Sequence, residues 1–133
     1  MAITFTDREL DVMAVLWQRD SGTVSEVRDA LAAELGYELA YNTVLTVLRT
    51  LQEKGYVRPV AEGRAHRYFP TVTQKQAGKS VLARVLDKVF AGSAESLLTQ
   101  LVSDRSVDAA ELRRLRKLLD DRLSASQKRG GKR

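Results

Sequence analysis

The chain has 133 residues, 44% of them hydrophobic and 29% charged, which is the balance of an ordinary soluble globular protein rather than of a disordered chain. It has no cysteine, so disulfides, thiolate metal sites and a cysteine nucleophile are excluded. Its net charge of +5 favours an anionic partner, although bases outnumber acids only in residues 73–133 (14 to 7) and not in residues 1–72 (8 to 10).

Two helices are predicted at the start of the chain. Thr6 and Glu9 have the spacing of a capping box. The apolar residues after them recur every third or fourth position, which predicts a helix over about residues 7–19. A short extended piece follows. Ser25 is expected to cap a second amphipathic helix, which ends at Gly36 because glycine adopts the left-handed conformation that closes many helices.

A third helix and a hairpin come next. Apolar residues at helical spacing predict a helix over about 41–54, and Gly55 ends it. The hydrophobic pattern then changes from the helical period of about 3.6 residues to the strand period of about 2. This change predicts strands at 56–60 and 65–69, joined by a turn in which Gly63 is free to take a positive φ.

Three further helices are predicted in the second half of the chain, over about residues 73–91, 94–103 and 108–123. Each of them carries leucine, valine or phenylalanine at about every third or fourth position. The basic tail 124–133, which ends in Lys-Arg-Gly-Gly-Lys-Arg, is expected to be disordered.

The order of the predicted elements is that of a winged helix. In that fold the third helix enters the major groove of DNA, and the hairpin, or wing, lies over the backbone or the minor groove. The predicted fold is therefore mainly α with a small β wing: an N-terminal winged helix-turn-helix and a C-terminal helical dimerisation segment. We expect a DNA-binding domain in residues 1–72, a dimerisation domain in 73–123 and the tail in 124–133.

The polar face of the third helix is the candidate base-reading surface. Asparagine pairs with adenine edges, threonine hydroxyls suit bases or phosphates, and arginine reaches guanine or a phosphate. A solvated polar face without a ligand is the alternative, but the hairpin that follows favours DNA contact. The candidate residues are Tyr41, Asn42, Thr43, Leu45, Thr46 and Arg49.

The hairpin contributes a second group of candidates. Arg64 follows the turn glycine and is expected at the exposed tip, and His66 and Arg67 come directly after it. These side chains are predicted to contact phosphate or the minor groove; the alternative is that they only keep the hairpin soluble. His66 has neither a cysteine nor a second histidine with which to share a metal, so no metal site and no cofactor are predicted.

The second half of the chain has more apolar surface than three short helices can bury against one another. Burial against a second copy of the chain, in a two-fold dimer, accounts for this surface. The alternative is a monomeric extension packed on the winged helix. The residues expected at the dimer interface are Leu82, Leu86, Phe90, Leu97, Leu98, Leu101, Leu112, Leu115 and Leu119.

Composition also bears on other classes of function. An enzyme needs a nucleophile and base, a phosphate loop or a metal cluster, and the chain has one histidine, no cysteine and no glycine-rich loop after a strand, so an enzyme is not expected. A winged helix that only contacts proteins is the alternative to a DNA-binding one, and Arg64 and Arg67 argue against it. No secretion leader opens the chain and no apolar run approaches the roughly 20 residues of a membrane span, so a cytoplasmic protein is expected.

Three stretches of the sequence together resemble one known family. They are the run 6–17, which ends in Leu-Trp, the run 39–55 with its Thr-Val-Leu-Thr-Val-Leu core, and the hairpin run 64–69 with its Arg-x-His-x-Tyr pattern. Over residues 5–123 the chain resembles the BlaI/MecI/CopY family of bacterial penicillinase-type repressors.

This resemblance implies a homodimeric repressor on operator dyads of the TACA/TGTA type. It places base reading at Asn42, Thr43 and Thr46 and dimerisation in the C-terminal helices. In the penicillinase branch a membrane sensor-protease triggers cleavage of an Asn-Phe bond in the C-terminal part, and the aligned pair here, Gln100-Leu101, departs from that pattern. The copper branch ends in a cysteine-rich metal site, which this chain lacks.

Overall fold

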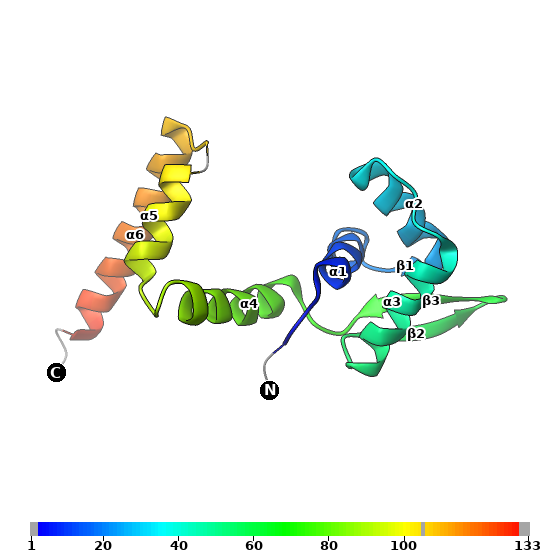
Figure 1. Cartoon of the computed structure of the whole chain (residues 1–133). Coiled ribbons are helices and arrows are strands. Elements are labelled where there is room, and N and C mark those ends of the chain that lie inside the picture. The colour runs from blue at the N-terminus through cyan, green and yellow to red at the C-terminus, as the bar shows by residue number, and fades with distance from the viewer. Residues whose placement is uncertain (1–2, 105, 131–133) are drawn as a thin grey trace. The chain divides into compact units, whose positions relative to one another are not determined.

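The computed structural model describes residues 3–104 and 106–130 of the chain. The protein is mainly helical with one small antiparallel sheet, which confirms the predicted fold class (Figure 1). Two compact units divide the chain between Val85 and Leu86, within α4. The elements are α1 (Asp7–Arg19), β1 (Gly22–Thr23), α2 (Val24–Leu35), α3 (Tyr41–Glu53), β2 (Val57–Glu62), β3 (Ala65–Pro70), α4 (Gln74–Val89), α5 (Ala94–Asp104) and α6 (Ala109–Gly130).

Local hydrogen bonds begin the first two helices. Thr6 and Glu9 form the predicted capping box of α1: the Glu9 amide donates to Thr6 Oγ1 (3.1 Å), and the Thr6 amide donates to Glu9 Oε1 (2.8 Å). A second capping box, between Thr23 and Glu26, begins α2. The expectation that Ser25 caps this helix is therefore wrong. Ser25 lies in the first turn of α2, and Thr23 has the extended backbone of a capping residue.

The three strands pair in the order β1–β3–β2. β2 and β3 form the wing, and their turn contains Gly63 with the predicted positive φ of 61°. β2 extends two residues further than predicted because its ladder continues up to the turn, and β3 extends one residue further at its other end, where Pro70 pairs with Val57. β1 pairs with the other edge of β3, where Thr23 lies opposite Arg67. This short pairing joins the start of α2 to the wing.

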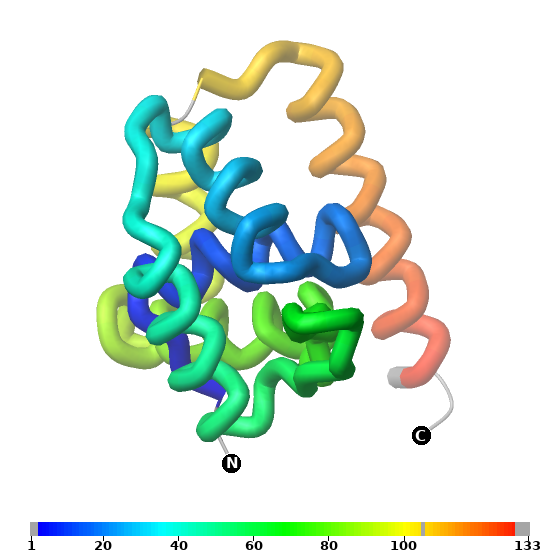
Figure 2. Tube along the Cα trace, turned by 90° about the vertical axis from the view of Figure 1, so that its right-hand side faces the viewer, coloured from blue at the N-terminus to red at the C-terminus, as the bar shows by residue number. Residues whose placement is uncertain are grey.

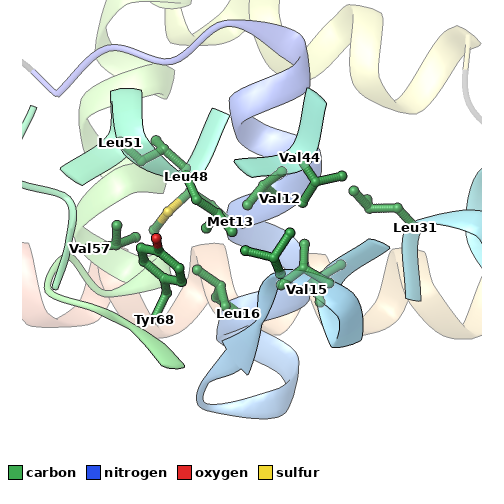
Figure 3. Close-up of a cluster of buried hydrophobic side chains, with 12 residues drawn as sticks. Val12, Met13, Val15, Leu16, Leu31, Val44, Leu48, Leu51, Val57 and Tyr68 are labelled. Atoms are coloured by element: carbon green, nitrogen blue, oxygen red, sulfur yellow. The ribbon is translucent and has the colours of Figure 1, made fainter. Parts of the chain in front are cut away.

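The core of the first unit lies among α1, α2, α3 and the sheet (Figure 3). Full burial of a large aliphatic side chain contributes about 1.5–3 kcal/mol, so this cluster is the main source of stability for the unit. Because α3 turns its apolar stripe into the cluster, its opposite face remains in solvent. The labelled core residues are Val12, Met13, Val15, Leu16, Leu31, Val44, Leu48, Leu51, Val57 and Tyr68.

The second unit has no comparable core. Among its described residues, none is buried. Figure 2 shows α6 (orange to red) on a path of its own, away from α5 (yellow), although the two overlap in the view of Figure 1. The apolar side chains of these helices therefore remain largely in solvent in a single chain.

The end of the chain differs from the expectation. α6 continues to Gly130, so residues 124–130, expected as part of a disordered tail, are helical. The rest of that tail, 131–133, lies outside the described residues. The functional division at residue 72 stays a prediction; the break between the compact units comes later, at Val85.

Candidate nucleic-acid interface

Helix α3 presents two opposite faces. Val44, Leu48 and Leu51 are fully buried in the core. Leu45 is half-buried at the edge between the faces. An exposed polar helix face of this kind fits the major groove, where base identity can be read. The structure places five of the predicted residues on or beside that exposed face: Tyr41, Asn42, Thr43, Thr46 and Arg49.

The hydroxyl of Thr46 is already engaged as a donor. It donates to the carbonyl oxygen of Asn42, one turn earlier (2.8 Å), and Thr50 donates in the same way to the carbonyl of Thr46 (3.0 Å). A hydroxyl has one proton and two acceptor lone pairs. Thr46 Oγ1 is therefore free to act as an acceptor, which suits the amino groups of adenine and cytosine and does not suit the acceptor edge of guanine.

The start of α3 differs from the starts of α1 and α2. Its capping residue, Ala40, makes no side-chain cap, and no acidic residue occupies its first turn. The first amides of a helix point outward and, with the helix dipole, attract anions. In α1 and α2 the hydroxyls of Thr6 and Thr23 accept a first-turn amide, and the carboxylates of Glu9 and Glu26 place a negative charge there. In α3 the Thr43 amide donates to the Ala40 carbonyl (3.1 Å), and the amides of Tyr41 and Asn42 are the ones that a phosphate could bind.

A shallow groove of about 180 Å³ separates α3 from the wing. It brings together Leu45, Arg49 and His66, three of the predicted residues, and adds Gln52 from α3. The sequence did not suggest Gln52, because its place in the groove depends on how closely the wing packs beside α3. Arg64 is exposed in the turn of the wing, as predicted for the tip. The polar side chains among them supply donors that suit phosphate oxygens.

Arg67 has a different environment from Arg64. Its guanidinium donates to both carboxylate oxygens of Glu62 (3.2 and 3.0 Å), to both of Glu26 (2.9 and 3.0 Å) and to Ser21 Oγ (3.2 Å). Glu62 and Glu26 raise the pKa of Arg67 further above its ordinary value, and Arg67 lowers the pKa of Glu26. The structure therefore groups Arg67 with carboxylates of the protein, apart from the other wing candidates. Its contact with DNA stays a prediction.

A partly buried ion pair joins α1 to the end of α3. Glu9 is only 4% exposed and accepts a hydrogen bond from Lys54 Nζ at 2.8 Å. Burial acts to raise the pKa of Glu9, but the hydrogen bonds from Lys54 and from the Thr6 amide outweigh it, so the pKa lies below its usual value. Sequence reasoning missed this pair because its members are 45 residues apart.

The predicted dimer residues lie on α4, α5 and α6 and are exposed or half-buried. Further apolar side chains of the second unit are strongly exposed, among them Val89 (69%) and Leu118 (65%). An open groove of about 480 Å³ is lined by Phe90, Leu97, Gln100, Leu101 and Asp104. The pair that aligns with the family's cleavage bond, Gln100-Leu101, thus lies inside α5.

Two further observations concern the described part of the chain. Residues 3–104 and 106–130 contain no group of three or more His, Asp or Glu side chains placed to hold a metal ion. Over the same ranges, no helix is both long and apolar enough to cross a bilayer.

Three helices packed on a small sheet, with a hairpin beside the exposed face of the third helix, define a winged helix-turn-helix protein. Comparison with known proteins agrees. The model of the penicillinase repressor family matches residues 5–121. The chain is 35% identical over 107 residues to the transcriptional regulator BlaI of Mycobacterium tuberculosis, which covers 79% of this chain and 76% of that protein.

Two other similarities are more distant. The penicillinase repressor of Bacillus licheniformis is 24% identical over 116 residues, or 87% of this chain and 89% of that protein. Among solved structures, the complex structure of hsRosR-S4 shares the fold, with a TM-score of 0.57 at 17% identity over 91% of each chain. The chain belongs to the penicillinase repressor family. It is therefore a DNA-binding transcriptional repressor, and the family resemblance suggested by its sequence is confirmed; such repressors are not enzymes.

Proposed function

We propose that the protein represses transcription as a homodimer that reads an operator dyad of the TACA/TGTA type, with one α3 helix and one wing on each half-site. The observation that carries this proposal is the division of α3 into a buried apolar face and an exposed polar face. The exposed face holds Asn42, Thr43 and Thr46 near the N-terminal end of the helix, which is the end that enters the groove in helix-turn-helix proteins.

Base reading and backbone binding fall to different residues in this proposal. Asn42 pairs with adenine, and Thr46 accepts a hydrogen bond from an amino group because its proton is engaged. Phosphates are bound by the N-terminus of α3, by Arg49 and His66 beside the groove, and by Arg64 at the wing tip. Phosphate contacts position the protein and supply much of the affinity, whereas contacts to base edges supply discrimination.

Dimerisation is assigned to the exposed apolar side chains of the C-terminal helices. Soluble proteins rarely leave large contiguous apolar surfaces in water. A two-fold dimer buries the same patch of each protomer against its copy, and an operator dyad has the matching symmetry. Leu112 and Leu119, one above the other on α6 and both exposed, are central to the proposed interface.

The proposal includes cleavage by a membrane sensor-protease at Gln100-Leu101, and family resemblance is its only support. The bond lies within α5. Proteases cut most readily in exposed, irregular chain, so α5 has to unwind locally before cleavage. Incubation of the purified repressor with membranes that contain the sensor, followed by mass measurement of the fragments, tests this step.

The proposed DNA reading is tested by selection. The full chain, purified, selects duplexes from a random-sequence pool, and fluorescence anisotropy compares the selected duplex with a scrambled one at one salt concentration. We expect an inverted repeat and a preference of about a thousandfold or more. Equal binding of both duplexes contradicts sequence-specific reading, and binding of neither favours a winged helix that contacts only proteins.

A further inference from the structure

Arg67 lies where the wing meets the body of the domain. It belongs to β3, Glu62 belongs to β2, and Glu26 belongs to the first turn of α2. Ser21 precedes β1, which pairs with β3 at Thr23 opposite Arg67. One guanidinium therefore connects both strands of the wing to the start of a helix in the body of the domain.

The hydrogen bonds of Arg67 use its full capacity as a donor. A guanidinium has five N–H groups and no acceptor. Five hydrogen bonds are formed here, two to Glu62, two to Glu26 and one to Ser21, at 2.9–3.2 Å. A contact from Arg67 to a DNA phosphate therefore has to replace a bond that already exists. Arg64, at the turn three residues earlier, is exposed.

We propose that Arg67 is a positioning residue: it latches the wing to α2 and so holds Arg64 within reach of the DNA backbone, without touching DNA itself. The inference rests on the proposed function, since it explains how the wing is placed for DNA binding. Glu26 connects the wing to the start of α2, because it accepts hydrogen bonds from Arg67 and its Oε1 also accepts the Thr23 amide (3.3 Å) in the capping box of α2.

The geometry makes this network stronger than a surface ion pair. Single exposed pairs contribute little, but bidentate geometry and shared partners are the recognised exceptions. The Arg67 side chain is only 25% exposed, and two carboxylates hold its planar fork from two sides. Lysine cannot reproduce this fork, although it binds phosphate well as a point charge. Substitution of Arg67 by lysine therefore distinguishes a role as a latch from a role as a phosphate contact.

The test uses four variants of the full chain: Arg67→Lys, Arg67→Gln, Glu26→Gln and, for contrast, Arg64→Gln. Glutamine at position 26 keeps the capping box of α2, because Gln serves there as well as Glu. Affinity for the duplex selected by the wild-type protein is measured by anisotropy at several salt concentrations. A thermal melt shows that each variant is folded.

For a latch, Arg67→Lys, Arg67→Gln and Glu26→Gln all weaken binding by about five- to tenfold, because the wing then has to be ordered when DNA binds. Arg64 still binds its phosphate in the complex, so the salt slope remains that of the wild type. Arg64→Gln weakens binding and flattens the slope by roughly 0.9 for each phosphate that is no longer neutralised. A phosphate contact by Arg67 gives the opposite pattern. Arg67→Lys then binds like the wild type, Glu26→Gln binds more tightly, and Arg67→Gln flattens the slope. That pattern overturns the proposal.

Amide hydrogen exchange in the free protein tests the latch without DNA. Arg67→Lys is expected to speed exchange in residues 57–70 and to leave α1 unchanged. Unchanged exchange in the wing overturns the latch even if DNA binding falls. If the wild-type chain does not distinguish the selected duplex from a scrambled one, the proposed function fails, and the exchange measurement still decides whether Arg67 holds the wing.

Discussion

The two compact units of this chain have opposite relations to water. In the first, nine large side chains are fully buried and the polar residues left outside form the candidate DNA surface. In the second, no described residue is buried, and leucine and valine side chains stand in solvent on α5 and α6. The first unit has its own core in a single chain, whereas the second has none and would gain one in the proposed dimer. The proposed function thus assigns DNA reading and assembly to different parts of the molecule.

The largest effect is expected where the second unit meets its proposed copy. Leu112→Glu combined with Leu119→Glu places charges in an apolar interface, twice over because of the two-fold axis. We expect the dimer to weaken by about 4 kcal/mol or more, roughly a thousandfold in Kd. Sedimentation equilibrium measures this change. Arg113→Glu, a charge reversal at a polar position of α6, is the control and leaves the dimer largely intact. A double variant that is still dimeric at micromolar concentration contradicts a dimer interface in the second unit.

A core substitution in the first unit comes next in size. Leu48→Ala removes a fully buried side chain of α3 and is expected to cost about 3 kcal/mol of unfolding free energy, because apolar burial is reduced and a cavity is left behind. Leu118→Ala, in the monomeric background of the previous variant, changes stability by less than about 0.5 kcal/mol because that side chain is 65% exposed. Denaturant unfolding of both variants gives the comparison. Similar losses for the two are incompatible with a core confined to the first unit.

Much of the first unit can be predicted because its signals act locally. The box of Thr6 and Glu9, the turn glycine Gly63 and the period of α3 each depend on neighbours within a turn or two. Even the correct cap of α2 was readable: Glu26 stands three residues after Thr23, the spacing of a capping box, and only one after Ser25. The exposed face of α3 followed from its apolar stripe alone.

Contacts between distant segments were not predictable in this way. The partners of Arg67 on α2 and before β1 lie 41 and 46 residues away, and no period in the sequence connects them. From the sequence alone, Arg67 is therefore grouped with Arg64 and His66 as a DNA contact. The helical extension of α6 beyond residue 123 was missed for another reason: its polar residues carry no apolar period, yet none of them before Gly130 breaks a helix.

Discrimination between DNA sequences should change without loss of fold when the exposed face of α3 is altered. Thr46→Ala is expected to cost about 1–3 kcal/mol on the selected duplex and much less on a scrambled one, because it removes an acceptor for a base edge. Thr50→Ala is the matched control, since Thr50 makes the same bond to the turn before it but lies one turn further from the helix start. Anisotropy with both duplexes gives the result. Equal losses on both duplexes mean that Thr46 contacts the backbone.

The ion pair between Glu9 and Lys54 gives a smaller, pH-dependent effect. The pKa of Glu9 is lowered in the folded protein, so its contribution is present above the ordinary carboxyl range near pH 4.5 and is lost as pH falls through the lowered value. Lys54→Met leaves a buried carboxylate without its partner and is expected to cost about 1.5 kcal/mol at pH 7, less than for a fully buried pair because Lys54 is partly exposed.

Unfolding at pH 7 and at pH 4 distinguishes this account from a simple loss of packing. Near pH 4 the unpartnered Glu9 of the variant takes up a proton, so the difference from the wild type shrinks. Lys54→Arg, which keeps the charge, is the control at both pH values. An equal loss at both pH values attributes the effect of Lys54→Met to the side-chain stem and not to the charge.

The smallest effect is expected from relief of backbone strain, which can be compared between the two units. Ala91, between α4 and α5, and Asp20, after α1, both have left-handed backbones, with φ of 50° and 72°. This conformation costs alanine about 1–2 kcal/mol, whereas aspartate tolerates it better. Glycine relieves the strain but adds entropy to the unfolded chain. Ala91→Gly is therefore expected to stabilise its helix junction by about 0.5 kcal/mol, and Asp20→Gly is expected to change little.

The Gly92 amide reports this difference directly, because it donates to the Leu86 carbonyl across the junction at 2.8 Å. Relief of strain at Ala91 makes opening of the junction rarer, so exchange of this amide slows by about twofold for 0.5 kcal/mol. Asp20→Gly leaves it unchanged, since that residue lies in the other unit. Faster exchange in Ala91→Gly means that the flexibility added by glycine outweighs the strain removed, and that the junction is held by its helices and not by the residue between them.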